Sequence, residues 1–145
     1  GQYAHGNEPS HHIAHLYNYV GQPWRTQEIV DEVLHTLYFN NPDGLSGNED
    51  CGQMSAWYIL NAMGFYQVCP GKPVYSIGRP LFNEATVHLK DGKSFKVIAH
   101  NNSRDNKYVR SIVLNGNKLE TPFFTHQDIV DGGTLELTMG SEPLK

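Results

Sequence analysis

The chain has 145 residues, enough for one ordinary domain with a modest hydrophobic core or for two small units. Its formal net charge of -4, with 18% charged residues, leaves no basic surface of the kind that binds nucleic acid. No apolar run approaches the roughly 20 residues that a membrane-spanning helix needs, so we expect no membrane span. The chain opens at Gly1 without Met and without a secretion signal, which is typical of a segment from inside a longer protein.

The first 65 residues carry apolar side chains at helical spacing, and we expect three helices there. Gly21 and Gly64 follow the first and third helices, at the position where glycine commonly ends a helix. Pro23 lies just inside the start of the second helix, where proline is tolerated. The third helix is apolar around much of its circumference and should be buried on more than one side. The expected helices cover about residues 9–20, 24–39 and 51–63.

Beyond residue 65 the pattern changes to short runs that are rich in β-branched and aromatic residues. The pairs Asp91-Gly92 and Asn115-Gly116 between these runs are hairpin signals. A short helical turn is expected near residues 126–130. Short strands joined by hairpins predict an antiparallel sheet or sandwich, so the fold class is α+β. The expected strands are residues 74–77, 85–89, 94–99, 111–114 and 134–139.

A loop crowded with acids and amides precedes the third helix. Asp50, with Gln53 three residues later, fits the capping-box pattern, and helix capping alone would account for this acid. The alternative is catalytic, because Asp43, Asn48 and Glu49 share the loop and an ionised carboxylate among them can act as a general base. Neutral Asn48 adds no like charge beside Asp50. The residues alone leave both interpretations open.

A second polar cluster, His5-Gly6-Asn7-Glu8-Pro9-Ser10-His11-His12, opens the first helix. Asn7 is the expected N-cap, and Glu8 in the first turn suits the helix dipole. Alternatively, Glu8 holds a hard cation together with amide oxygens and water. His11 and His15 have a zinc-like spacing but lack the intervening acid of the His-Glu-x-x-His pattern. Both helix entrances carry carboxylates, amides and imidazoles, which indicates one shared pocket for a polar, sugar-like ligand.

Aromatic residues concentrate in the helical half of the chain. Most of those at helical spacing are expected in the core. One or two near the helix starts could instead stack on the apolar C–H face of a sugar ring, and Trp57 is our candidate.

These motifs closely resemble the late catalytic region of family 92 glycoside hydrolases, which are calcium-dependent exo-acting α-mannosidases and most often α-1,2-mannosidases of gut-type bacteria. The resemblance extends over essentially the whole chain, and the two loop motifs are long enough to be highly specific. The matching segments are residues 5–12, 17–24, 42–45, 47–57, 64–66, 75–82 and 114–116.

The resemblance implies that residues 1–65 are the last helices of an (α/α)6 catalytic barrel and residues 66–145 the antiparallel β region after it. It also implies inversion of configuration, with one carboxyl as acid and another as base for the attacking water. Asp50 falls at the position of the base. The general acid is expected upstream of Gly1, in a Glu-Gly-Asn-Ala-Trp type of motif that this chain lacks. Some relatives carry a second acid where this chain has Asn48.

The resemblance further implies Ca²⁺ as cofactor, with Glu8 as a ligand of the metal or of the sugar in the −1 subsite, and mannose-containing oligosaccharides or N-glycans as substrates. Calcium would engage the 2- and 3-hydroxyls of the sugar and help to distort its ring. A periplasmic or secreted location and dependence on the rest of the enzyme chain follow in the same way, so the 145 residues alone should be inactive. A non-catalytic carbohydrate-binding module is the alternative. The expected substrate-binding residues are Asn7, His12, Asn48 and Trp57.

Overall fold

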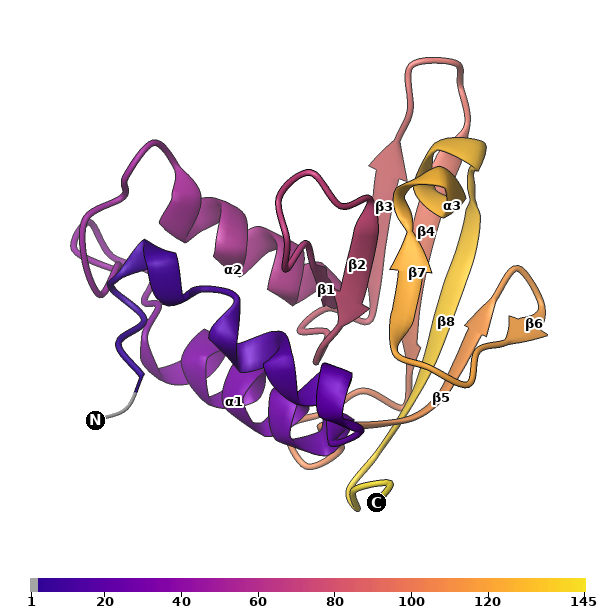
Figure 1. The fold of residues 1–145 in the computed structure, drawn as a ribbon, viewed down its shortest axis with the longest axis horizontal. Coiled ribbons are helices and arrows are strands. Elements are labelled where there is room, and N and C mark those ends of the chain that lie inside the picture. Colours follow the sequence, from indigo (N-terminus) through magenta and orange to yellow (C-terminus); the bar gives the residue numbers. More distant parts are fainter. Residues whose placement is uncertain (1–2) are drawn as a thin grey trace.

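The computed structural model describes residues 3–145 and has its N-terminal helices on one side and two β-sheets on the other, with the short helix α3 beside the strands (Figure 1). The expected α+β class is confirmed. None of the helices in the described part of the chain is both long and apolar enough to cross a membrane. The helices are the 3-10 segments η1 (Glu8–Ser10) and η2 (Ile13–Val20), and the α-helices α1 (Pro23–Thr36), α2 (Gln53–Met63) and α3 (His126–Asp131). The strands are β1 (Phe65–Tyr66), β2 (Val74–Ile77), β3 (Glu84–His88), β4 (Ser94–His100), β5 (Tyr108–Leu114), β6 (Asn117–Lys118), β7 (Phe123–Thr125) and β8 (Gly133–Gly140).

The first helical segment differs from the single α-helix expected from the sequence, because it consists of two 3-10 segments, η1 and η2. In a 3-10 helix, side chains three residues apart lie on the same side. His15 and Asn18 are therefore both buried, and both reach Ser76, with 3.0 Å from His15 Nδ1 and 2.7 Å from Asn18 Nδ2 to its hydroxyl. Gly21, in the left-handed conformation with φ 72°, ends η2 as predicted.

The two longer helices match their predictions with shifted ends. α1 stops at Thr36 rather than near Phe39, because Tyr38 forms an antiparallel bridge with Leu45 and Phe39 N–H donates to the Gly44 carbonyl. The polypeptide thus leaves the helix to form a closed turn. α2 ends at Gly64, as predicted, with φ 108°.

The strands form a three-stranded sheet in the order β1-β2-β7 and a five-stranded sheet in the order β3-β4-β8-β5-β6. The predicted hairpins at Asp91-Gly92 and Asn115-Gly116 join β3 to β4 and β5 to β6, both antiparallel. The expectation of purely antiparallel pairing is wrong at one place, because β8 pairs parallel with β4. Strand β8 reaches this position only after β5, β6, β7 and α3, and inserts between β4 and β5.

Two clusters of buried apolar side chains hold the molecule together. One lies between the two sheets, where the rings of Phe95 on β4 and Phe124 on β7 stack with centroids 5.7 Å apart. The other lies among the helices and includes Val30, Leu34 and Trp57. The sheets therefore share one core, as expected for a sandwich, and the helices form a second core beside it.

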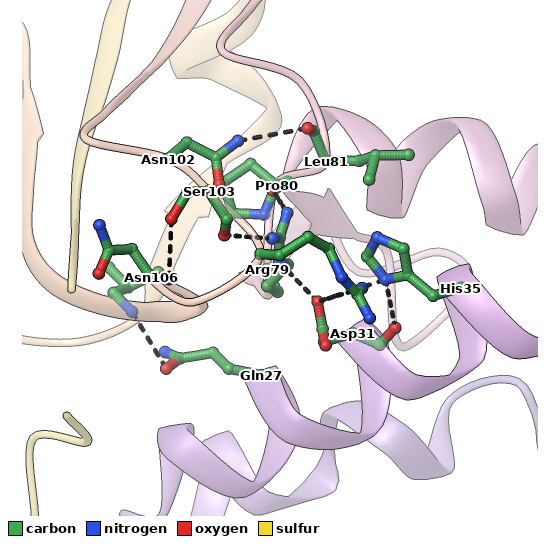
Figure 2. A network of polar contacts seen from close by, with 11 residues as sticks. Gln27, Asp31, His35, Arg79, Pro80, Leu81, Asn102, Ser103 and Asn106 are labelled. Atoms are coloured by element: carbon green, nitrogen blue, oxygen red, sulfur yellow. Dashed lines mark hydrogen bonds and ion pairs between the residues drawn. The ribbon is translucent and has the colours of Figure 1, made fainter. Parts of the chain in front are cut away.

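A polar interface attaches α1 to the β region (Figure 2). The Arg79 guanidinium, which is 2% exposed, lies with Nε 2.9 Å from a carboxylate oxygen of Asp31 and donates from Nη2 to the Ser103 carbonyl at 2.9 Å. One turn earlier on α1, Gln27 accepts a hydrogen bond from the Val109 N–H at 3.1 Å. Burial lowers the pKa of Arg79, and the negative charge of Asp31 acts against that shift.

Candidate active site

The two polar loops identified in the sequence are in backbone contact with each other. A Cβ atom added to Gly6 would lie 2.0 Å from the Ser46 carbonyl oxygen, and one added to Gly47 would lie 2.7 Å from the Gly6 carbonyl oxygen. No larger residue fits at either position without moving the backbone. The loop that carries Glu8 and the loop that carries Asp50 therefore form one surface, as the shared-pocket hypothesis requires.

Asp50 lies in an unusual turn and does not cap α2. Asp50, Cys51 and Gly52 have φ angles of 38°, 57° and 85°, three consecutive residues in the left-handed region. The predicted capping box with Gln53 is wrong, because the N-cap residue is Gly52 and α2 has no side-chain cap of that kind. The Asp50 carboxylate is exposed and has no hydrogen-bond or ion-pair partner within residues 3–145. Capping thus does not account for this acid.

Glu49, rather than Asp50, is the acid that accepts hydrogen bonds from the first turn of α2. Its two carboxylate oxygens accept hydrogen bonds from the Ser55 N–H at 3.0 Å and the Ser55 hydroxyl at 2.7 Å, in the first turn of α2. These bonds lower the pKa of the Glu49 carboxyl. The Glu49-to-Ser55 spacing of six residues lies outside the standard capping box, so the sequence did not reveal it. The bonds close the turn that presents Asp50.

Glu8 lies in the first turn of η1, after Asn7 at the N-cap position. Asn7 is at the predicted position, but its side chain makes no capping hydrogen bond. The Oε1 atom of Glu8 is buried and has no hydrogen-bond partner among the described residues. A buried, unpaired carboxylate oxygen is unfavourable in a protein alone. This orphaned oxygen fits a ligand of a hard cation such as Ca²⁺.

The described residues do not bring further carboxylate, imidazole or thiol donors together around Glu8 to complete a cation site. Within residues 3–145, no three His, Cys, Asp or Glu side chains cluster in a way that would hold a metal ion. Among the other candidates, Asn7 and Asn48 are exposed and His12 is half-buried. None of these three side chains makes a hydrogen bond within the described residues, so their polar atoms are free for a ligand.

Trp57, expected from the sequence to bind substrate, is fully buried. Its indole N–H donates to the His11 carbonyl at 3.0 Å, and its ring packs edge-on against His5 at a centroid distance of 4.3 Å. No face of the indole is open to a sugar ring in this structure. Trp57 belongs to the buried core among the helices. From there it supports the segment that carries Glu8, through its hydrogen bond to the His11 carbonyl.

A group of imidazoles and phenols underlies the two loops. His5 and His11 stack with ring centroids 4.6 Å apart, and the two ring nitrogens of His5 lie 2.8 Å from the Tyr3 hydroxyl and 2.5 Å from the Tyr38 hydroxyl. Tyr38 donates its own proton to the Met54 carbonyl, so His5 Nε2 is the donor to Tyr38 and His5 Nδ1 accepts from Tyr3. Burial, with a smaller effect of His11, lowers the pKa of His5 to about 4. His5 is therefore neutral at physiological pH.

Acid should destabilise the fold through His15, whose burial lowers its pKa to about 4 from 6.5. The unfolded chain takes up a proton as the pH falls below 6.5, whereas folded His15 resists it until about pH 4. The free energy of unfolding should therefore fall between pH 6.5 and about pH 4, and His15 should account for about 3 kcal/mol of this loss. Urea unfolding at neutral pH and at about pH 4.5 measures the loss, and the variant His15→Asn should lose less between the two. An equal pH dependence in both proteins would contradict the assignment.

Comparison with known proteins identifies the family. The model of the glycosyl hydrolase family 92 catalytic domain matches residues 1–141 of the chain. The chain belongs to glycoside hydrolase family 92. This confirms the resemblance inferred from the loop motifs.

Two solved structures are similar to this family 92 chain over 99% of its length. One is a family 92 α-mannosidase from Bacteroides thetaiotaomicron, 45% identical with a TM-score of 0.93, which has also been solved with mannoimidazole. The other is a family 92 inverting mannosidase from the same organism, 50% identical with a TM-score of 0.91. A curated relative from Arthroderma benhamiae, described as an uncharacterized secreted glycosidase, is 31% identical over 140 residues, which is 94% of the chain. The chain spans only 18–19% of the length of these three proteins.

Proposed function

We propose that this chain is the C-terminal part of a calcium-dependent exo-α-mannosidase that removes terminal α-linked mannose with inversion of configuration. Membership of family 92 makes it part of a glycoside hydrolase. The observation that carries the proposal is the backbone contact between Gly6 and Gly47, which joins the loops of Glu8 and Asp50. The similar proteins of known structure are an α-mannosidase and an inverting mannosidase, which supports mannose as the sugar.

In this proposal Asp50 is the general base. Its carboxylate has no protein partner within residues 3–145, so an oxygen is free to take a proton from the water that attacks the anomeric carbon. The left-handed turn of residues 50–52, closed by Glu49, holds this carboxylate outside the helix. The general acid belongs to a part of the enzyme outside these 145 residues.

The other residues bind rather than react. Glu8 would provide its buried, unpaired oxygen to Ca²⁺, which when bound supplies positive charge for sugar hydroxyls. Asn7, His12 and Asn48, whose side chains are free of protein hydrogen bonds, would orient the hydroxyls of the mannose ring. Trp57 supports the Glu8 loop through the His11 carbonyl.

The substrates we propose are mannose-containing oligosaccharides or N-glycans, with α-1,2 linkages as the first to test. A periplasmic or secreted location fits this substrate, and the curated relative is described as secreted. The rest of the enzyme chain is the partner that completes the barrel.

Removal of calcium tests the proposal directly. In the full-length enzyme, a chelator should abolish release of mannose from an α-1,2-mannobiose, and added Ca²⁺ should restore it. Glu8→Gln should raise the Ca²⁺ concentration for half-maximal activity by about tenfold or more, because one charged ligand becomes neutral. Glu120→Gln, at an exposed carboxylate far along the chain, is the matched control and should change nothing.

The same assay tests the stereochemistry of hydrolysis and the alternative function, a non-catalytic carbohydrate-binding module. Proton NMR of the first product should show β-mannose, as inversion requires. Full activity in the presence of the chelator would contradict the calcium assignment. Binding of mannosides without turnover by the full-length protein would favour a carbohydrate-binding module instead.

A further inference from the structure

A network of buried hydrogen bonds connects the three-stranded sheet with both loops of the candidate site. All but one of its members are 0–2% exposed, and Gln53 is half-buried. We call it the His15 network. It consists of Ser76, His15, Asn61, Trp57, His11 and Gln53.

The network begins at the end of β2. The Ser76 hydroxyl lies 3.0 Å from His15 Nδ1, and His15 Nε2 lies 2.8 Å from Asn61 Oδ1. Asn61 donates from Nδ2 to the Trp57 carbonyl at 2.9 Å. This commits the amide nitrogen, so Asn61 Oδ1 faces His15, and His15 must carry its proton on Nε2. Ser76 then donates to His15 Nδ1 and accepts from Asn18 Nδ2 at 2.7 Å.

The network ends at the two loops. The Trp57 indole N–H donates to the His11 carbonyl at 3.0 Å, and His11 Nε2–H donates to the His5 carbonyl at 2.9 Å. His5 directly precedes the Gly6–Glu8 loop. Gln53 Nε2 donates to His11 Nδ1 at 3.0 Å, while its backbone N–H donates to the Asp50 carbonyl at 3.1 Å. One set of hydrogen bonds therefore reaches the backbone on both sides of the site.

Burial makes these bonds restrictive. Water cannot replace a lost partner at a residue with no exposed surface, so each group keeps its geometry or is left unsatisfied. The backbone at Gly78 also packs closely against the His15 ring, since a Cβ atom added there would lie 3.1 Å from it. This limits the movement of His15 relative to the end of β2. A movement of β2 would therefore be transmitted to His15 and, through Asn61, to Trp57.

We propose that the His15 network positions the Glu8 and Asp50 loops relative to the β-sheets, and that Ser76 and Trp57 are positioning residues of the active site. The inference rests on the proposed mannosidase function. It also gives a role to the segment of residues 75–82, which belongs to the family resemblance but supplies no residue to the proposed chemistry. The β region is, in this view, a support for the catalytic loops rather than a sugar-binding surface.

Two conservative variants of the full-length enzyme test the proposal. Ser76→Ala removes the donor to His15, and Trp57→Phe removes the donor to the His11 carbonyl while it retains an aromatic ring. Each should lower kcat by about tenfold with KM within about twofold, because a misplaced base affects the reaction more than ground-state binding. The double variant should lose little more than the worse single variant, because both act through one network. Val97→Ala, in the core between the sheets, is the control and should retain kcat.

Hydrogen exchange gives a readout that is independent of activity. Amides in residues 5–12 and 46–54 should exchange faster in Ser76→Ala and in Trp57→Phe than in wild type, but not in Val97→Ala. Unchanged exchange in these segments, multiplicative losses of kcat, or an equal loss in Val97→Ala would overturn the proposal. If wild type shows no mannosidase activity, the proposed function fails, while the exchange data still decide whether the network holds the loops.

Discussion

Replacement of Asp50 by Asn in the full-length enzyme should lower kcat for α-mannoside hydrolysis by about 10³-fold, within the range known for loss of a general base. An amide cannot accept the proton of the attacking water. The fold should survive, because the Asp50 carboxylate makes no hydrogen bond or ion pair within residues 3–145 and Asn tolerates positive φ. Initial rates together with thermal unfolding separate the two effects, and the unfolding midpoint should stay within a few degrees.

The neighbouring acid provides the matched control. Glu49→Gln changes the charge by the same amount one residue away, but its side chain is bound to Ser55. It should weaken the first turn of α2 and reduce kcat far less than Asp50→Asn does. Near-normal turnover in Asp50→Asn, or a larger loss in Glu49→Gln, would remove Asp50 from the role of base.

Local signals in the sequence were sufficient for much of the fold. Gly21 and Gly64 end helices because each adopts positive φ, which few other residues tolerate, and Asn115-Gly116 forms a hairpin for the same reason. The 3-10 form of η2 was not predicted from the local spacing, and its buried residue His15 bonds to Ser76, which lies 61 residues away in the sequence. The parallel pairing of β8 with β4 is likewise set by contacts between segments far apart in the sequence.

In the candidate site, too, the features set by local sequence were predictable and those set by contacts between distant segments were not. The loop motifs identified the family and brought Glu8 and Asp50 into consideration, since their residue types and spacing are local. The capping interpretation of Asp50 failed because residues 50–52 all have positive φ and Gly52, rather than Asp50, is the N-cap residue of α2, which spacing does not reveal. The inward position of Trp57 depends on the His11 carbonyl, which belongs to another segment. Sequence reasoning therefore found the loops but not the network behind them.

The ion pair between Asp31 and Arg79 should contribute strongly to the stability of the fold (Figure 2). In Arg79→Met the new side chain is of similar length, but the Asp31 side chain, which is 10% exposed, loses its main partner. Loss of one member of a buried pair typically costs about 3–5 kcal/mol. His35 and Arg104 remain 3.3 and 3.6 Å from the Asp31 oxygen, so we expect a loss near about 3 kcal/mol.

The double variant Asp31→Leu/Arg79→Met distinguishes an unpaired charge from lost packing. It removes both charges, so its free energy of unfolding should lie closer to that of wild type than the value for Arg79→Met alone. Urea unfolding of the three proteins under identical conditions measures the difference. A double variant less stable than Arg79→Met would mean that the Asp31 carboxylate contributes through its contacts with His35 and Arg104 even without Arg79, so that the interface does not depend mainly on the ion pair with Arg79. The ion pair would then be a secondary contact, and the attachment of α1 to the β region would depend more on contacts such as the hydrogen bond from the Val109 N–H to Gln27.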